Sequence, residues 1–542
     1  MAAETRAEEA KRGGIARNTA IFSILTGVSR IAGLVREVVA ASYFGTGGPI
    51  SAFTFAFQLP NLVRSLFADA ALSSAFVPVF TELLEKGRRR EAFQLASTFV
   101  VLIIGILGSL CVFFVLVAPY FMPLLTGSEF TPALDALASG LSQVLFPIVL
   151  LLGLNGLLVG ILNAYDHFTI PALSPLVWNA VILAMLVITT PMFHGNDQLY
   201  AYAFGVLAGT LVQLLMALPV LRKLDFQFEW TLRLRDPRVK QVLLLMLPVT
   251  LSLGLINFDL LINSMLGSEV SDQAPRAIDA AFRIYMLPQG MFSVAVATVL
   301  FPALARLATR GDTVGLRAMA ATGMRQIFLL LLPAAALMLV LAEPMTQLVY
   351  QRGHFNTKST DLVSEALFWF SFSLPFAGVN LLLTRTFFSL QRPWLPTKLA
   401  GASLLLNVVV SLALYKPLGI AGVVIGTAVA SIAMTYGQAY YLREELGGLI
   451  EGRATRRAVA RILLACVLLC AVSYVLQRIL RGLLGTSTIA QILSVGTALT
   501  AGIAIYCRAV LRMRVDEAHE IRAAVQKRLA SRRAARRPPR RR

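Results

Sequence analysis

The chain has 542 residues, of which 57% are hydrophobic and only 14% are charged, against about 25% charged residues in ordinary globular domains. This composition and a mean hydropathy of +0.72 exclude a soluble enzyme with a single anchor, and they exclude disordered, collagenous and disulfide-framework proteins. The net charge of +20 does not indicate nucleic-acid binding, because about half of it lies in residues 512–542 and most of the rest lies between apolar segments, as in the loops of membrane proteins.

The N-terminus is polar over residues 1–17 and is followed by a long apolar segment that contains arginines and has no small-residue cleavage site. We therefore expect this segment to stay as a membrane helix rather than to be removed as a signal peptide. Because a span needs about 20 mostly apolar residues, the sequence predicts about fourteen membrane helices. Their limits are 18–43, 52–83, 93–120, 138–164, 172–193, 200–222, 240–266, 276–308, 320–342, 361–390, 396–415, 419–442, 457–480 and 489–511.

The loops between these segments alternate in basic content, which predicts the orientation of the chain. Loops 44–51, 121–137 and 193–200 have no Lys or Arg, whereas Lys and Arg are frequent in the segments 86–90, 222–240, 306–325 and 443–461 and in the C-terminal tail. Both termini are therefore expected in the cytoplasm. This orientation places a few basic residues on the outer side, as exceptions to the alternation: Arg352, Lys358, Lys416, Arg478 and Arg481.

An internal repeat accounts for twelve of the predicted helices. The matched residues, each pair 228 positions apart, are Pro60 with Pro288, Pro147 with Pro375, and Asn179 with Asn407. Because six helices separate the two copies, they are expected to form two six-helix lobes of the same orientation around a central cavity. The predicted parts are a cytoplasmic N-terminal segment 1–17, an N-lobe 18–222, a C-lobe 223–442 with its cytoplasmic linker, two further helices 443–511 and a basic cytoplasmic tail 512–542.

Charged residues inside the predicted helices are the functional candidates, because they are costly in a membrane unless they face a cavity or a partner. They are Arg30, Arg36 and Glu37 in the first helix, Arg64 and Asp69 in the second, Asp259 in the seventh, Asp279 and Arg283 in the eighth, and Arg385 in the tenth. Arginines outnumber carboxylates in the first two helices. The surplus indicates an anionic guest, and guanidinium groups suit phosphate oxygens.

The alternative is that these charges only pair with one another inside the protein. The pairs would be Arg30 with Glu37, Arg64 with Asp69, and Arg283 with Asp279. In that case the arginines are structural, and the sequence leaves both interpretations open.

The sequence lacks a phosphate-binding P-loop, an HExxH zinc motif, a nucleophile elbow and a recognisable catalytic carboxylate set, so we expect neither an enzyme nor a bound cofactor. Energy for transport would come from the membrane potential or an ion gradient. Broken helices, which are typical of transporters, are expected at Pro60, Pro78, Pro147, Pro288, Pro302 and Pro375.

Several stretches resemble the MurJ (MviN) family of lipid II flippases, in the multidrug/oligosaccharidyl-lipid/polysaccharide exporter superfamily. They are SRIAGLVREVVAASYFG, SAFTFAFQLPNLVRSLFADAALSSAFVPVF, FPIVLLLGLNGLLVGILNAYDHFTIPALSPLVWN and LPQGMFSVAVATVLFPALARLA. The resemblance implies a monomeric inner-membrane protein that moves lipid II, the undecaprenyl-diphosphate-linked peptidoglycan precursor, to the outer leaflet by alternating access. Its place would be in peptidoglycan biosynthesis, cell-wall biogenesis and cell shape.

Carried over by motif, the resemblance also implies the residues of the site. Arg30, Arg36, Arg64 and Arg283 match the family's cavity arginines, the last three of them as diphosphate contacts. Their charge partners would be Glu37, Asp69 and Asp279. An undecaprenyl tail would lie in a groove bordered by the last two helices.

The chain departs from the family pattern at Glu37, where Asp is common, and at Ser51 and Phe282, where acids occur in other members. The last two departures weaken a proton-carrier role at those positions. Some members bind sodium in the second lobe, and the matching residues are Asp259, Asn407, Ser411 and Thr427. Ser411 replaces a second carboxylate there, and interhelical hydrogen bonding by Asn407 and Thr427 is the alternative.

Further expected partners are anionic membrane lipids at the basic tail and cell-wall synthesis enzymes, but not nucleic acid. An exporter of another polyprenyl-linked oligosaccharide would need the same arginines. A polyprenyl-phosphate transferase and a scaffold for cell-wall enzymes are the alternatives from other classes.

Overall fold

The computed structural model describes residues 25, 27–67, 70–165, 167, 169–224, 226–448, 452–485, 487–523 and 526. These residues are almost entirely helical and include no β-strand. Eleven of the helical stretches among them are long and apolar enough to cross a membrane. The predicted all-α membrane fold is confirmed, and a total of fourteen spans is compatible with it.

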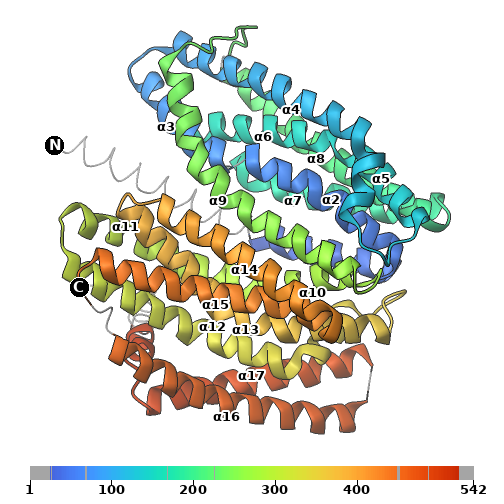
Figure 1. The fold of residues 1–542 in the computed structure, drawn as a ribbon, viewed down its shortest axis with the longest axis vertical. Helices are drawn as coiled ribbons and strands as arrows, with labels where there is room; N and C mark the ends of the chain where they lie inside the picture. Colours follow the sequence, from blue (N-terminus) through green and yellow to red (C-terminus); the bar gives the residue numbers. More distant parts are fainter. Residues whose placement is uncertain are drawn as a thin grey trace, which may run out of the picture. The chain divides into compact units, whose positions relative to one another are not determined.

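The chain divides into two compact units, of which the first comprises Met1–Asp279 and Tyr350–Ser359. Its first described helix covers residues 27–44. The helices that follow are α2 (Gly48–Phe67), α3 (Ala70–Glu85), α4 (Arg89–Leu125), α5 (Pro132–Leu145), α6 (Pro147–Ala164), α7 (Thr169–Thr189), the short η1 (Thr190–Met192) and η2 (Gly195–Asp197), α8 (Gln198–Lys223), α9 (Pro237–Ser268) and the start of α10 (Ala274–Pro288) (Figure 1).

The second unit comprises Ala280–Val349 and Thr360–Arg542. After the end of α10 it contains η3 (Gln289–Ser293), α11 (Val294–Thr309), α12 (Thr313–Tyr350), α13 (Thr357–Ser389), α14 (Trp394–Leu418), α15 (Ile420–Glu445), α16 (Gly452–Leu484) and α17 (Thr488–Arg512). Each of the predicted membrane segments overlaps between one and three of the helices of the two units.

Helix breaks occur at two of the six expected prolines. Because proline lacks an N–H, it cannot continue the hydrogen-bond ladder. Phe146 separates α5, which ends at Leu145, from α6, which begins at Pro147. Pro288, at the end of α10, is followed by the π-helical turn η3. By contrast, α2, α3, α11 and α13 continue through Pro60, Pro78, Pro302 and Pro375. A further kink, not predicted, lies at Leu341 in α12.

The core of the first unit is apolar and rich in aromatic pairs. Helix α2 packs on α5 and α9, α3 packs on α6 and α9, and α7 packs on α8. The rings of Phe53 and Tyr202 stack at 4.3 Å between centroids. Helix α9 thus belongs to the first compact unit. The repeat instead assigned α9, as part of residues 223–442, to the C-lobe, and these lobe limits remain a prediction.

The linker before α9 is tied to α4 by polar contacts. Arg238 donates to Glu91 at 2.6 Å, and the backbone N–H of Glu229 donates to Ser97 at 3.1 Å. Arg238 also donates to the Asp236 carboxylate, which caps α9. Partial burial raises the pKa of Asp236, but the bonds and charge of Arg238 outweigh this effect and hold the pKa below its ordinary value.

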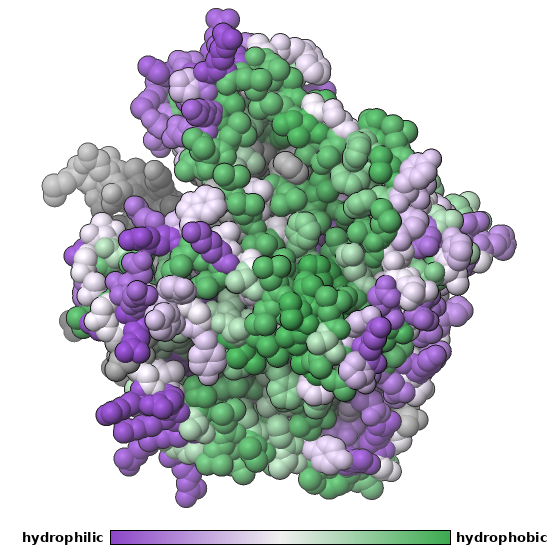
Figure 2. Space-filling view, in the orientation of Figure 1, coloured by the Kyte–Doolittle hydropathy of each residue, from purple (hydrophilic) through white to green (hydrophobic). Residues whose placement is uncertain are grey.

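In the second unit, α14 pairs with α15 and α16 pairs with α17. A core cluster joins α16 and α17 to α12, and within it the Tyr506 hydroxyl donates to the Leu329 carbonyl at 2.6 Å. Figure 2 shows, within each unit, apolar side chains across the middle of the visible face and hydrophilic side chains at the helix ends. This distribution is typical of helices that cross a bilayer.

Candidate functional site

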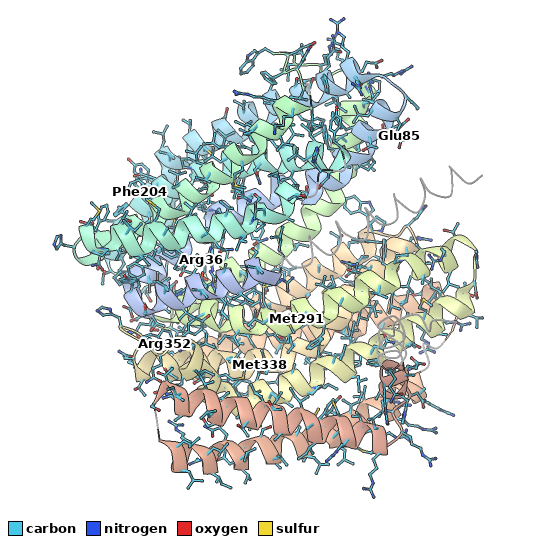
Figure 3. All side chains as sticks on the ribbon, turned by 180° about the vertical axis from the view of Figure 1, so that it is seen from behind. Arg36, Glu85, Phe204, Met291, Met338 and Arg352 are labelled. Atoms are coloured by element: carbon cyan, nitrogen blue, oxygen red, sulfur yellow. The ribbon has the colours of Figure 1, made fainter. Side chains whose placement is uncertain are left out.

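The first helix carries a buried ion pair, which lies within the first unit. Arg36 and Glu37 are 7% and 3% exposed, and Arg36 Nη2 donates to Glu37 Oε1 at 2.6 Å. Figure 3 labels Arg36 among the helices of this unit. The sequence predicted both residues as site residues, and the structure places their charges in direct contact.

Arg276 of α10 extends this pair, and the sequence analysis missed it. Its Nη2 lies 3.4 Å from Glu37 Oε2, and its Nη1 donates to Asp279 Oδ2 at 2.9 Å. Arg276 is 3% exposed. It stands at the first residue of the predicted segment 276–308, where an arginine is expected to reach the headgroups. The signal that could have revealed it is the three-residue spacing to Asp279 on one helix face.

Trp178 of α7 also contacts the guanidinium of Arg36. The Arg36 guanidinium carbon lies 4.8 Å from the centroid of the Trp178 ring, and Trp178 Nε1 donates to Thr210 of α8 at 3.1 Å. The next residue, Asn179, donates to the Ser29 carbonyl of the first helix at 3.4 Å. Helix α7 therefore orients the helix that bears Arg36, through a cation–π contact and a hydrogen bond.

The four charges of this cluster, Arg36, Glu37, Arg276 and Asp279, balance one another. A balanced, hydrogen-bonded set is how buried charges persist in a membrane protein, because a single unpaired charge there is costly. Arg36 nevertheless keeps its Nε buried without a hydrogen-bond partner among the described residues. The cluster can therefore exchange one contact for an anionic ligand at Arg36.

Arg64 lies in a second polar chain at the end of α2. Its Nε and Nη2 donate to Asn61 Oδ1 at 3.0 and 2.7 Å, and Asn61 Nδ2 donates to Asn257 of α9 at 3.1 Å. The side-chain amides of Asn61 and Asn257 thus hold the Arg64 guanidinium in place and link α2 to α9. Asn61 and Asn257 were not predicted as site residues.

The remaining predicted residues fall in different places. Arg30 is exposed on the first helix, and no hydrogen bond or ion pair of the described residues involves it. Asp69 lies outside the described residues. Asp279 and Arg283 share α10, but Asp279 belongs to the first unit and Arg283, half-buried, to the second.

The residues of the predicted sodium site are also divided between the units. Asp259 lies on α9 in the first unit and is 3.5 Å from Asn263 Nδ2. In the second unit, buried Ser411 of α14 is 3.0 Å from Asn407 Oδ1 and 3.0 Å from the Val423 carbonyl of α15. The described residues contain no group of three or more His, Cys, Asp or Glu that could hold a metal.

Residues 42–46, at the end of the first helix, contact residues 353–359, which comprise the end of the loop after α12 and the start of α13; we call this contact the loop clasp. Both parts belong to the first unit. The His354 N–H donates to the Ser42 carbonyl at 2.9 Å, and Thr46 Oγ1 donates to Ser359 Oγ at 2.7 Å. Gly45 and Gly353 have φ of 61° and 57°, and a Cβ on Gly353 would lie 2.3 Å from the Ser42 carbonyl oxygen. The close backbone approach therefore requires glycine there.

Comparison with known proteins decides the family. The model of the lipid II flippase MurJ matches residues 40–494. The chain belongs to the MurJ family. A probable lipid II flippase MurJ from Rhizobium meliloti (strain 1021) is 31% identical over 411 residues, which cover 74% of this chain and 76% of that protein. The family resemblance expected from the sequence is confirmed, and membership places this MurJ-family chain among transporters rather than enzymes.

Solved structures agree on the fold. A lipid II flippase MurJ in an inward closed conformation superposes with a TM-score of 0.73 at 22% identity, covering 91% of this chain and all of that one. An inward-facing multidrug transporter of the MATE family, in the MOP superfamily, gives a TM-score of 0.67 at 16% identity and covers 77% of this chain and 94% of that chain. The MurJ-family chain is therefore a multi-pass membrane protein with the fold shared by these transporters.

Proposed function

We propose that this protein is a lipid II flippase, which moves the undecaprenyl-diphosphate-linked peptidoglycan precursor from the inner to the outer leaflet of the cytoplasmic membrane. The observation that carries the proposal is the family match over residues 40–494. The arginines inside the apolar helices support it, since they provide the cations that a diphosphate needs.

Arg30, Arg36, Arg64 and Arg283 are proposed as the substrate-binding residues, the last three of them as diphosphate contacts, with Glu37, Asp69 and Asp279 as charge partners. Two of the arginines are held in ways that suit this role. Arg36 is fixed between Glu37 and the Trp178 ring, and Arg64 is fixed by Asn61. Fixed guanidinium groups lose little freedom on binding, so the ligand is recognised by charge and geometry together.

We propose alternating access as the mechanism, with the loop clasp as one contact that forms and breaks in each cycle. The clasp consists of few hydrogen bonds between backbone and hydroxyl groups. Such a contact is compatible with opening on the timescale of transport, because these few polar groups can form hydrogen bonds with water once the clasp opens. Rocking of the two six-helix lobes would then expose the cavity to each side in turn.

The driving force is proposed to be the membrane potential or an ion gradient. Sodium at Asp259, Asn407, Ser411 and Thr427 is one candidate, and proton coupling is the other. Replacement of NaCl by KCl in a flipping assay on proteoliposomes separates them: a sodium-coupled protein slows in KCl, and Asp259→Asn removes the difference. Equal flipping rates in NaCl and KCl, in both the parent and Asp259→Asn, would leave a proton gradient or the membrane potential as the driving force.

The protein is proposed to be a monomer in the bacterial inner membrane with both termini in the cytoplasm. Lipid II is its proposed substrate, with anionic lipids at the basic tail and cell-wall synthesis enzymes as further partners. Export of another polyprenyl-linked oligosaccharide is the second candidate, because the same arginines would bind any polyprenyl diphosphate.

The test is rescue of a bacterium depleted of its own lipid II flippase, with externally accessible lipid II as the readout. The intact protein should rescue growth, and Arg36→Ala at the same membrane level should not. Arg456→Ala, an exposed arginine at the start of α16, is the matched control and should rescue. Rescue by Arg36→Ala would contradict the diphosphate role of Arg36, and failure of the intact protein to rescue would favour the other oligosaccharide.

A further inference from the structure

We propose that the second unit binds the headgroup of an amine-bearing phospholipid, such as phosphatidylethanolamine, in a cavity between α12, α13 and α16. The cavity has a volume of about 890 Å³, and all of its lining residues belong to the second unit. Its charged residues are Glu343 of α12, Asp361 and Glu365 of α13, and Arg478 and Arg481 of α16. None of them takes part in the proposed lipid II site.

Two walls of this cavity carry opposite charges. Asp361 and Glu365, one helical turn apart on α13, are exposed and form no ion pair with another described residue. On the α16 side of the cavity, Arg481 forms an ion pair with Glu343 of α12 at 3.2 Å. Arg478 has no carboxylate partner among the described residues; its Nε donates to the Tyr474 hydroxyl at 3.2 Å, and its guanidinium carbon lies 5.5 Å from the Tyr474 ring centroid.

Among the described residues, Asp361 and Glu365 thus have no cationic partner and Arg478 has no carboxylate partner. All three line the same cavity. A ligand with one positive and one negative group satisfies both walls, whereas a simple anion or cation satisfies only one. Phosphate oxygens suit the Arg478 guanidinium, and a primary ammonium donates to the carboxylates of α13. A metal ion is a poorer fit, because no group of three metal-ligating side chains exists in the described part of the chain.

The surroundings of the cavity favour a lipid over a soluble zwitterion. Phe368 and Tyr474 line it and are 37% and 47% exposed, and aromatic side chains of this kind mark the membrane–water interface. Ile479 and Leu483, next to the arginines on α16, are 52% and 76% exposed and can contact acyl chains. Arg478 and Arg481 were exceptions to the charge alternation of the loops; Arg481 pairs with Glu343, and a lipid phosphate gives Arg478 a ligand.

The experiment is native mass spectrometry of the purified full chain with equimolar phosphatidylethanolamine, phosphatidylglycerol and phosphatidylcholine of identical acyl chains. The amine-bearing lipid should be retained at least about fivefold over the other two, because phosphatidylglycerol has no cation for the carboxylates and the quaternary ammonium of phosphatidylcholine has no N–H to donate to them. Arg478→Gln and Glu365→Gln should each abolish the preference. Arg478→Lys should keep most of it, because the charge remains.

Matched controls make the same charge changes outside the cavity. Arg457→Gln, exposed at the other end of α16, and Glu444→Gln, exposed at the end of α15, should leave the preference unchanged. Equal melting temperatures of all variants show that folding is intact. Three results would overturn the proposal: equal retention of the three lipids, a preference that survives both Arg478→Gln and Glu365→Gln, or binding of soluble phosphoethanolamine as tight as that of the lipid.

Discussion

Arg276 reaches Glu37 across 239 positions of the chain, with Nη2 3.4 Å from Oε2. Through this contact α10 neutralises a carboxylate on the first helix, next to Arg36, which is proposed to bind the diphosphate. Glu37 is shared between two arginines, so the freedom of Arg36 to accept a ligand depends on a residue far away in sequence.

Arg276→Met should lower the free energy of unfolding by about 3 kcal/mol, because Glu37 and Asp279 both lose a buried cation. The measurement is thermal melting of the purified protein in detergent. Arg457→Met, an exposed arginine, is the control and should melt as the parent does. Identical melting of both variants would mean that the ion pairs of Arg276 contribute nothing.

Asn61→Ala should weaken lipid II binding by about tenfold, because Arg64 loses the oxygen that accepts two of its hydrogen bonds. Titration of the purified protein with lipid II checks this. Gln143→Ala removes a half-buried amide bonded to the Val115 carbonyl in the same unit, and it should bind as the parent does. Unchanged affinity in Asn61→Ala would refute the positioning role of Asn61.

A disulfide across the loop clasp should stop flipping. With the four native cysteines replaced by Ser, Thr46→Cys with Ser359→Cys places two thiols where hydroxyl oxygens lie 2.7 Å apart. Oxidant should abolish lipid II flipping in proteoliposomes, and reductant should restore it. The control pair, Thr126→Cys with Asp135→Cys, joins the end of α4 to α5 within the predicted N-lobe and should flip in both states. Full activity of the oxidised clasp would show that it need not open.

The stability of the α4–α9 junction should fall at acid pH. Because Arg238 holds the pKa of Asp236 below its ordinary value of 3.8, the contribution of Asp236 is complete above about pH 4 to 5 and is lost as the pH falls toward the folded-state pKa. Melting temperatures from pH 6 to pH 3 should therefore drop less steeply in Asp236→Asn than in the parent. Asp312→Asn, at the start of α12, is the control and should follow the parent. An equal decrease of melting temperature with pH in Asp236→Asn and the parent would contradict the prediction.

Gly422→Ala should destabilise the α14–α15 hairpin. A Cβ at Gly422 would lie 2.1 Å from the Leu414 carbonyl oxygen, and backbone cannot move aside as a flexible side chain can. We expect a loss of about 1–3 kcal/mol, measured by thermal melting. Gly401→Ala on α14, where nothing lies within 4 Å of the added methyl, should not be destabilised. A loss of the same size in both variants would point to backbone entropy rather than to the close approach.

The sequence by itself determined the membrane class, the helical segments and the family, because these depend on local composition, segment length and contiguous motifs. The apolar segments became helices, since a bilayer leaves backbone groups no other partners. Arg36, Glu37 and Arg64 were found in the same way, as charges in apolar surroundings.

Only the tertiary structure decided which charges meet. The sequence left open whether Glu37 pairs with Arg30, whereas the fold brings Arg36 and Arg276 to Glu37 and leaves Arg30 exposed. It also placed Trp178 over Arg36 and Asn257 of α9 against Asn61 of α2. The physical reason is that hydropathy and helical periodicity assign a residue to a helix and a face, but the partner across a helix contact depends on how distant helices pack, which no local pattern records.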